Sequence, residues 1–539
     1  MKRASRITCA LLAALLLFAL TACSTPSDPP SGSPPTGAPS PSSSTPDASS
    51  PPSDELPYVE LDWYTGLGND YNMDFDMVLA QAAADYILEK LNVKVNFIWF
   101  DLTADVLEKM PILISSGQDM GIVSYGPNVG VPYLTNSLNG AFAPLDDLLD
   151  QYAPATKALF SAENWACMNV GGDIFGVPTL KDNAYVMNAV YNQTMADALG
   201  IDMSGYEWKN IMELEPLLME VWEKRNAWMP EWSDRTLLLL GVPSPWPHTF
   251  AVDVYAAGNL GAVCNIPGLM EINGYDANTV FNLYGTPEFL EYALCAARLA
   301  DVGIQNVETQ LSWTDTQAYS FLRPGWGWIR TADNMHGDDH VMKLMPSART
   351  WTDTSTFHSA GLAISSSCKE KERAMMVIEL MNTDPYLATL VRWGLEEEHW
   401  VRDENGKMTQ DGSIRNSDPG AGIKYQNWYG AWFGNLLIVE APENFVGPNN
   451  EFMTRLKEIN ESALANHMGF VLDQEPIVTE LAAVSAVIGE YVPTLQQGVL
   501  LSEGRVTAYV EEFNAKLYDN GLQRIIDEVQ RQLNLFRGA

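Results

Sequence analysis

The fold is decided by VELDWYTGLG, residues 59–68, in which apolar and polar residues alternate before two glycines. This alternation predicts a β-strand that ends at the glycines. A helix is expected over residues 75–91, a second strand over 93–100, a second helix over 104–115 and a third strand over 120–124. Three strand-to-helix steps in a row favour a parallel sheet within an α/β architecture.

The ends of these strands carry aromatic and polar residues. Trp63-Tyr64, Phe100-Asp101 and Ser124-Tyr125 close the three predicted strands in turn. In open parallel sheets, ligands bind outside the carboxyl ends of the strands. The sequence therefore predicts that these three pairs lie beside a ligand-binding cleft.

Later segments carry clear helix and turn signals. Thr286-Pro287 marks the start of a helix expected to end near Asp301, because Thr is a good N-cap and Pro suits the first helical position. Asn405-Gly406 is expected to form the turn of a β-hairpin. Two amphipathic helices are expected at the C-terminus, over residues 506–518 and 522–536.

The segment from 357 to 382 is expected to continue the α/β pattern. Residues 357–364 are mostly apolar and predict a strand. Ser366 or Ser367 is expected to start the following helix, which runs to about residue 382. The sequence contains no internal repeat, which argues against an array-like adhesin or cell-wall protein.

The N-terminus has the features of a secretory signal. A basic start with Lys2, Arg3 and Arg6 precedes an apolar run over residues 7–20, which is shorter than the roughly 20 residues that a membrane-spanning helix needs. Leu20-Thr21-Ala22-Cys23 resembles the lipobox of bacterial lipoproteins, in which cleavage leaves a lipidated cysteine at the new N-terminus. We therefore expect a signal peptide over residues 1–22 and a lipid anchor on Cys23, on the extracytoplasmic face of the cell membrane. An ordinary secretory signal is the alternative.

The next segment, residues 24–57, holds eleven Pro and eleven Ser and no aromatic residue. Such a composition buries too little apolar surface to offset the entropy of ordering, so a disordered linker is expected from the anchor to residue 57. An O-glycosylated stalk is an alternative that the serines permit.

Charge and cysteine content narrow the class of protein. The 539 residues include 68 acidic and 32 basic ones, for a net charge of −36. This charge argues against nucleic acid or an anionic lipid surface as a partner, because phosphates are repelled. Beyond the signal and the anchor, the cysteines are too widely spaced for a CxxC metal or redox motif, which leaves disulfides open; they are Cys167, Cys264, Cys295 and Cys368.

A series of short motifs resembles a known family, the extracellular solute-binding lipoproteins of ABC importers, and in particular their long sugar-binding subgroup. No motif is specific alone, but the order and spacing match over nearly the whole mature chain. The motifs are SSGQD (115–119), FAPLDDLL (142–149), GDIFGVP (172–178), YN (191–192), LGID (199–202), KERAMMVIELMN (371–382), GLEEEHW (394–400) and the closing helix that ends at Phe536.

The resemblance implies a two-lobed clamp of type II, in which each lobe is a mostly parallel sheet flanked by helices and the chain carries extra C-terminal helices. The N-terminal lobe is expected over 58–178 and 358–425, the C-terminal lobe over 179–357 and 426–475, and the extra helices over 476–539. Hinges are expected near Pro178 and Phe357. Such a monomeric protein captures a carbohydrate between its lobes without turning it over and delivers it to a membrane permease.

Sugars are recognised by flat aromatic faces and by polar side chains that match their hydroxyl groups. Aromatic and polar residues at strand ends, in Gly-containing turns and near the crossing segments are therefore the candidate ligand-binding residues. They are Trp63, Tyr64, Asp101, Tyr125, Asn183, Trp326, Trp328, Arg330, His358 and Trp428.

Two other functions are compatible with an anchored chain: a surface glycoside hydrolase, and a peptide-binding lipoprotein of the same fold. A hydrolase needs two carboxylates at a set separation, and 68 acidic residues make candidate pairs uninformative. The sequence has no nucleophile elbow, P-loop or HExxH motif, so we expect no enzyme activity, no cofactor and no metal. Asp403, Asn405 and Asp411 resemble a calcium loop but lack its Gly and Glu positions.

Overall fold

Two large hydrophobic cores organise the computed structural model, both within Glu55–Ala539. The expected signal peptide, Cys23 and the Pro/Ser linker up to residue 55 lie outside the described residues. The structure describes residues 56–67, 76–101, 104–185, 187–203, 211–225, 250, 252–254, 261–269, 271–304, 322–326, 340–344, 350–409, 433–442 and 451–538.

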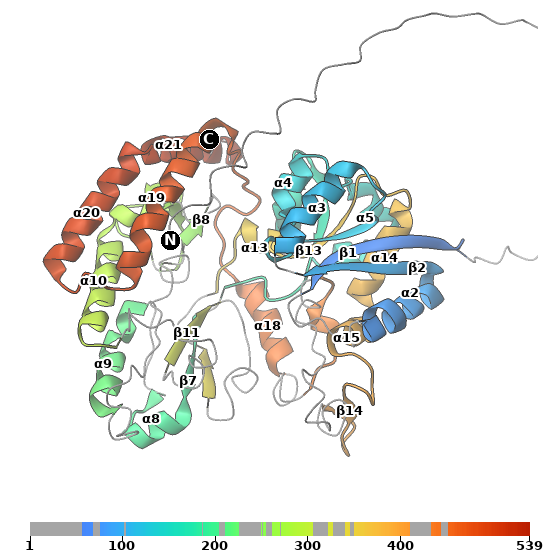
Figure 1. Cartoon of the computed structure of the whole chain (residues 1–539), viewed down its shortest axis with the longest axis horizontal. Helices are drawn as coiled ribbons and strands as arrows, with labels where there is room; N and C mark the ends of the chain where they lie inside the picture. The colour runs from blue at the N-terminus through green and yellow to red at the C-terminus, as the bar shows by residue number, and fades with distance from the viewer. Residues whose placement is uncertain are drawn as a thin grey trace, which may run out of the picture. The chain divides into compact units, whose positions relative to one another are not determined.

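A five-stranded sheet organises the first part of the fold (Figure 1). Its order is β2 (Val93–Asp101), β1 (Val59–Leu67), β3 (Ile122–Tyr125), β13 (Gly361–Ile364) and β6 (Gly176–Pro178). Strand β1 pairs in parallel with both β2 and β3, as the alternating sequence predicted. Strand β13 runs antiparallel to β3 and to β6.

Helices cover both faces of this sheet. Figure 1 shows α3 (Ala104–Ser116) on one side of β1 and β2, and α2 (Ala84–Leu91) and α15 (Pro385–Trp393) on the other. A π-helical turn, η1 (Asp76–Ala83), leads into α2. Other helices that contribute buried residues to the same core are α4 (Tyr133–Leu138), α5 (Asp146–Tyr152), α7 (Ala162–Met168), α13 (Thr354–His358) and α14 (Lys371–Thr383).

A second core is built around residues 191–304 and the C-terminal helices. Its strands form two three-stranded sheets, with the orders β11-β7-β12 and β10-β9-β8. The strands are β7 (Met187–Asn192), β8 (Val252–Val254), β9 (Ala262–Asn265), β10 (Phe281–Asn282), β11 (Leu322–Trp326) and β12 (His340–Leu344). The helices are α8 (Gln193–Leu199), α9 (Glu215–Lys224), α10 (Pro287–Asp301), α19 (Val478–Gln496), α20 (Glu503–Asp519) and α21 (Leu522–Phe536).

Every strand pair described in this second part is antiparallel. The parallel sheet expected in both lobes is therefore found, among the described residues, only in the first. Chain connectivity gives a reason for β8 and β9: only residues 255–261 join them, whereas a parallel crossover needs a dozen residues or more.

The segment expected as a strand over 357–364 divides into two elements. Asp353 caps α13 by accepting a hydrogen bond from the backbone N–H of Thr356 at 2.9 Å, so residues 354–358 are helical. Only residues 361–364 form β13. The side chain of Asp353 thus overrides the strand-like pattern that follows it.

The next helix begins at Lys371 rather than at Ser366 or Ser367. The hydroxyl groups of Ser365 and Ser367 are 2.8 Å apart, and the backbone N–H of Cys368 donates to the Ser365 carbonyl. These bonds form a turn that competes with the helix start.

Other local predictions are confirmed. Thr286 caps α10, accepting a hydrogen bond from the N–H of Phe289 at 3.2 Å. Gly406, with φ of +75°, lies in the turn between β14 (Val401–Arg402) and β15 (Met408–Thr409). The two C-terminal helices form as expected. The cysteines at 167, 264, 295 and 368 are buried and carry no disulfide.

Candidate ligand site

The carboxyl edge of the five-stranded sheet is the candidate site. Strands β1, β2 and β3 are parallel, so their ends at Leu67, Asp101 and Tyr125 meet at one edge. Strand β6 runs in the same direction and ends there at Pro178. This is the edge at which α/β sheets bind ligands.

Trp63 lies inside the core at this edge. Its side chain is fully buried, its indole N–H donates to the Ser124 hydroxyl at 3.1 Å, and its ring stacks on Phe97 with centroids 5.1 Å apart. Phe433 packs edge-on against the same ring at 5.1 Å. In this structure the ring of Trp63 is therefore part of the hydrophobic core beneath the sheet edge, and it exposes no face to a ligand.

Tyr64, on the opposite face of β1, is also buried. Its hydroxyl accepts a hydrogen bond from Gln118 Nε2 at 3.0 Å. Burial, followed by the nearby Asp62 carboxylate, raises the pKa of the Tyr64 hydroxyl. The side chain of Tyr64 is thus neutral and is held within the protein.

Tyr125 and His358 link the edge to neighbouring helices. The ring of Tyr125 is buried 4.9 Å from that of Tyr133, and burial raises its pKa well above the usual value. Gly361 makes room for it, because a Cβ there would lie 2.2 Å from the Tyr125 hydroxyl oxygen. The Nε2 atom of His358 is 2.7 Å from the carbonyl oxygen of Cys167.

Asn183 lies in the segment that leaves β6 for the second core. Its backbone N–H donates to Asn460 Oδ1 at 3.0 Å, and its carbonyl accepts from the Thr352 hydroxyl at 2.6 Å. Its side chain is buried and closes a local turn by donating to the Thr179 carbonyl at 3.1 Å. In this structure Asn183 joins two crossing segments.

Three crossing segments lie side by side near this residue. Tyr185 and Trp351 exchange backbone hydrogen bonds of 2.7 and 3.2 Å. The N–H of Thr352 donates to the carbonyl of Leu464 at 2.8 Å. Helix α18 (Glu451–Ser462) leads directly into this third segment.

The other candidate residues are only partly placed or not placed. Asp101 is the last residue of β2 and Trp326 the last of β11, and their side chains lie outside the description. Trp328, Arg330 and Trp428 lie outside the described residues.

The structure adds an edge residue that the sequence analysis missed. Trp99 is paired in register with Thr65, two residues before the end of β2, and keeps part of its surface exposed. Its ring is stacked against Phe97, with centroids 6.5 Å apart. Phe97, Trp99 and Asp101 occupy every second position of β2, and this spacing indicates that the three residues lie on one face of the strand.

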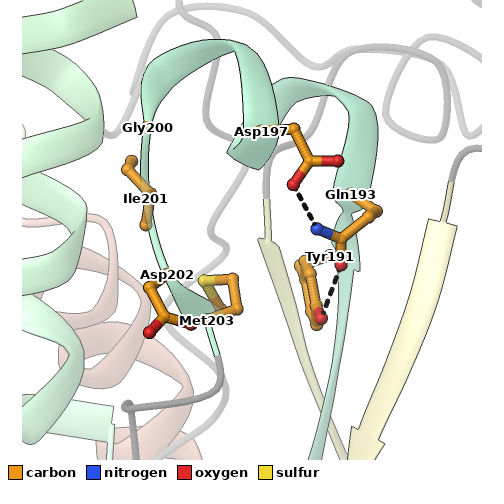
Figure 2. Close-up of a pocket in the computed structure, with 7 residues that line it drawn as sticks. All are labelled: Tyr191, Gln193, Asp197, Gly200, Ile201, Asp202 and Met203. Carbon is orange, nitrogen blue, oxygen red and sulfur yellow. Dashed lines mark hydrogen bonds between the residues drawn. The ribbon is translucent and has the colours of Figure 1, made fainter.

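A separate open pocket of about 630 Å³ lies between β7 and the residues after α8 (Figure 2). Its polar side chains bond to one another: Tyr191 donates to Gln193 at 2.9 Å, and Gln193 donates to Asp197 at 2.7 Å. None of the candidate residues lines it, so we do not assign it as the ligand site. Its lining residues are Tyr191, Gln193, Asp197, Gly200, Ile201, Asp202 and Met203.

Comparison with known proteins shows which proteins this chain resembles in sequence and in fold. The chain is 24% identical over 478 residues to a carbohydrate ABC transporter substrate-binding protein of Streptococcus pneumoniae serotype 4 (strain ATCC BAA-334 / TIGR4), with 86% of this chain and 88% of that protein covered. A family described as a domain of unknown function, DUF3502, matches residues 466–538.

Solved structures of the N-glycan transport solute binding protein NgtS from Streptococcus pneumoniae have the same fold. One matches with a TM-score of 0.71 and 22% identity over 88% of this chain and 98% of that one. The same protein in complex with Man1GlcNAc matches with a TM-score of 0.65 and 22% identity over 89% of this chain and 100% of that one.

These findings confirm the resemblance to solute-binding proteins of ABC importers and the two-lobed α/β fold. The relatives are transport proteins rather than enzymes, and substrate-binding proteins of this class work outside the cytoplasm.

Proposed function

We propose that this chain is the substrate-binding component of an ABC importer and that it captures an oligosaccharide for delivery to a membrane permease. The observation that carries the proposal is the similarity to a carbohydrate substrate-binding protein over 86% of this chain and 88% of the relative. The fold supports it, because the chain covers 98% of a solute-binding protein of N-glycan transport.

The ligand is proposed to bind at the carboxyl edge of the five-stranded sheet, between two lobes with the boundaries expected from the sequence. Asp101, Trp326, Trp328, Arg330 and Trp428 are the proposed contacts. Four buried candidates and the partly buried His358 would hold this surface in place from within the core; the buried ones are Trp63, Tyr64, Tyr125 and Asn183. Lobe closure is proposed to bend the crossing segments after Pro178 and before Phe357.

A lipid on Cys23 is proposed to anchor the mature, monomeric protein to the outer face of the cell membrane. The Pro/Ser linker would then hold the binding domain away from the lipid surface, at a distance set by its length and stiffness. This arrangement keeps the captured sugar close to a permease in the same membrane.

We propose binding without turnover, in keeping with the transport role of the relatives. The remaining alternatives are a surface glycoside hydrolase and a peptide-binding protein of the same fold. They predict cleavage of a bound glycan and stabilisation by peptides, respectively.

A thermal-shift screen of the chain from Asp54 onward tests the proposal. The panel contains Man5GlcNAc, fructo-oligosaccharides, monosaccharides and short peptides. A ligand that binds only the folded state stabilises it by about 2.7 kcal/mol at a concentration of a hundred times Kd. We expect an oligosaccharide to raise the melting temperature; stabilisation by peptides alone would overturn the carbohydrate assignment.

A further inference from the structure

We propose that the end of the Pro/Ser linker docks on a tyrosine pair, Tyr86 and Tyr386, and that this contact fixes where the linker leaves the binding domain. The docking segment is residues 51–55, Pro-Pro-Ser-Asp-Glu, which directly precede the described chain. The contact involves neither the carboxyl edge of the sheet nor the proposed sugar function.

The first described residues are fixed to the C-terminal end of α2. Asn92, which follows this helix, has φ of +51°, a left-handed conformation that Asn adopts more readily than most residues. Its Nδ2 donates to the carbonyl of Leu56 at 2.8 Å, and its own carbonyl accepts from the N–H of Val59 at 3.2 Å. The linker therefore leaves the domain beside α2, where β1 begins.

The tyrosine pair lies close to this exit. The rings of Tyr86, on α2, and Tyr386, at the start of the neighbouring α15 (Figure 1), are 4.7 Å apart at 46°. The Tyr86 hydroxyl donates to Asp384 Oδ2 at 2.9 Å, which holds the ring in place. Tyr386 is 57% exposed despite its contact with Tyr86. The pair is thus a fixed aromatic surface that is still accessible from outside.

The composition of the linker suits such a surface. Proline-rich segments adopt the polyproline II conformation and bind aromatic side chains at a low cost in entropy. Pro51 and Pro52 are the last adjacent prolines before the domain. A second copy of the folded domain is a less specific occupant, because nothing ties it to this side of the molecule as Asn92 ties the linker.

The acidic end of the segment has a cationic neighbour on the same helix face. Lys90 Nζ lies 5.0 Å from the centroid of the Tyr86 ring. Lys90 forms an exposed ion pair with Glu89 at 3.2 Å, and such a pair is weak enough to exchange for another carboxylate. Asp54 and Glu55 supply carboxylates between the prolines and the fixed Leu56.

The length of the connection permits the contact. Tyr86 lies six residues before Asn92, about 9 Å along the helix axis at 1.5 Å per residue. Residues 52–56 cover about 12 Å in polyproline II at 3.1 Å per residue. Pro51 and Pro52 can therefore reach the tyrosine pair directly from the fixed position of Leu56.

Docking would place the start of the free linker away from the carboxyl edge. Strand β1 runs from Val59 to Leu67 at that edge, a distance of roughly 26 Å at 3.3 Å per residue. An anchored domain held in this way turns its carboxyl edge away from the point where the linker leaves. Only residues 24–50 would then remain as the free part of the linker.

The test measures a distance between the linker and α2 in the mature chain, residues 23–539, with Cys23→Ser so that it stays in solution. Spin labels are attached at Ser49→Cys and at Asp85→Cys, which is exposed, while the other four cysteines are buried. Pulsed electron spin resonance is expected to give one narrow distance distribution. An undocked segment of this length behaves as a coil of about 15 Å root-mean-square length, so its distribution is expected to be about twice as wide or wider.

Two changes remove the proposed contact from either side. Tyr386→Ala deletes the exposed ring and keeps the hydrogen bond between Tyr86 and Asp384, so the domain is expected to stay folded. Pro51→Ser combined with Pro52→Ser changes only the linker. Each change is expected to broaden the distance distribution to that of a coil.

Matched controls separate the contact from general effects. Tyr518→Ala removes another exposed tyrosine, on α20, and Pro34→Ser with Pro35→Ser removes an earlier pair of prolines from the same linker. Both controls are expected to keep the narrow distribution of the parent protein.

Three results would overturn the proposal. The first is a parent distribution as broad as that of the Tyr386→Ala variant. The second is equal broadening by the control changes in the linker. The third is a narrow distribution that appears only at concentrations where light scattering detects a dimer sensitive to Tyr386→Ala, because the tyrosine pair would then bind a second copy of the chain.

Discussion

Trp63 is the residue at which the expected role and the structural role differ most clearly. It was predicted to contact ligand because it ends a strand, yet its ring is buried between Phe97 and Phe433. Removing a buried tryptophan side chain leaves a cavity and costs about 3–5 kcal/mol. We therefore expect Trp63→Ala to lower the free energy of unfolding by about this amount in guanidinium titrations, and Trp63→Phe to lower it less. A Trp63→Ala variant with the same free energy of unfolding as the wild type would contradict this packing role.

His358 predicts how stability changes with pH. Burial lowers its pKa, outweighing the Cys167 carbonyl and the Asp353 carboxylate, which both raise it. The unfolded chain therefore binds a proton on this residue at a higher pH than the folded protein does, and stability falls as the pH drops below about 6.5.

His358→Gln removes this titration and keeps a side-chain donor for the Cys167 carbonyl. Between pH 7.5 and 5.5, the melting temperature of the wild type is expected to fall further than that of the variant. Parallel pH profiles for the two proteins would show that His358 is protonated equally well in both states and would contradict the prediction.

The burial of the candidate residues could not be predicted from the sequence because it depends on distant segments. Phe433 covers Trp63, and Gly361 makes room for Tyr125, although both are far away in the chain. Strand ends show where a cleft forms, whereas only packing shows which of the aromatic residues there face it. Trp99 was overlooked because it lies inside β2 rather than at its last position.

At the scale of elements, local signals predicted most of the first sheet and several helices. The strands β1 and β2, the cap at Thr286 and the helices α20 and α21 follow from alternation, capping and amphipathic periodicity. The prediction was wrong over residues 357–360, which do not join the strand, and over 366–370, which precede the helix; hydrogen bonds that involve Asp353, Ser365 and Ser367 decide the backbone there. Antiparallel pairing in the second part depends on connection lengths that only the observed strands define.

One polar side chain of helix α18 forms hydrogen bonds with a crossing segment. Asn460 accepts a hydrogen bond from the N–H of Asn183 at 3.0 Å and donates to the carbonyl of Lys181 at 2.6 Å. Asn460→Ala is expected to lower the free energy of unfolding by about 1–3 kcal/mol, because part-buried backbone groups lose their partner. Amide hydrogen exchange around residues 181–185 should accelerate.

Asn460→Asp is the matched variant, since it keeps the acceptor for Asn183 and loses the donor for Lys181. Its stability is expected to lie between those of the wild type and Asn460→Ala. Unchanged exchange in both variants would show that α18 does not hold this crossing segment.

At the scale of the whole molecule, the C-terminal helices belong to the second core. Residues 466–538 match a family described only as a domain of unknown function, but α19 and α20 pack on α10, and α21 packs on β9. The stretch Glu475–Gln496 is long and apolar enough to cross a membrane by composition alone. Its buried residues, among them Val484 and Tyr491, lie within this core instead.

A chain truncated after residue 474 tests whether the second core depends on the C-terminal helices. Removing α19, α20 and α21 exposes the apolar surface of α10 and its neighbours, so we expect the shortened chain to be insoluble or to lack a cooperative thermal transition. The full-length domain from Asp54 is the control. A truncated chain that melts cooperatively near the temperature of the control would show that the C-terminal helices form a separate domain.

The central claim is that the protein captures an oligosaccharide without altering it. Equilibrium dialysis against Man5GlcNAc and related oligosaccharides, followed by mass spectrometry of the bound and free glycan, tests it most directly. We predict one equivalent of an oligosaccharide bound per chain and recovered intact after long incubation. Recovery of shortened glycans would contradict the claim in favour of a hydrolase, and the absence of saturable binding to any oligosaccharide would contradict carbohydrate capture itself.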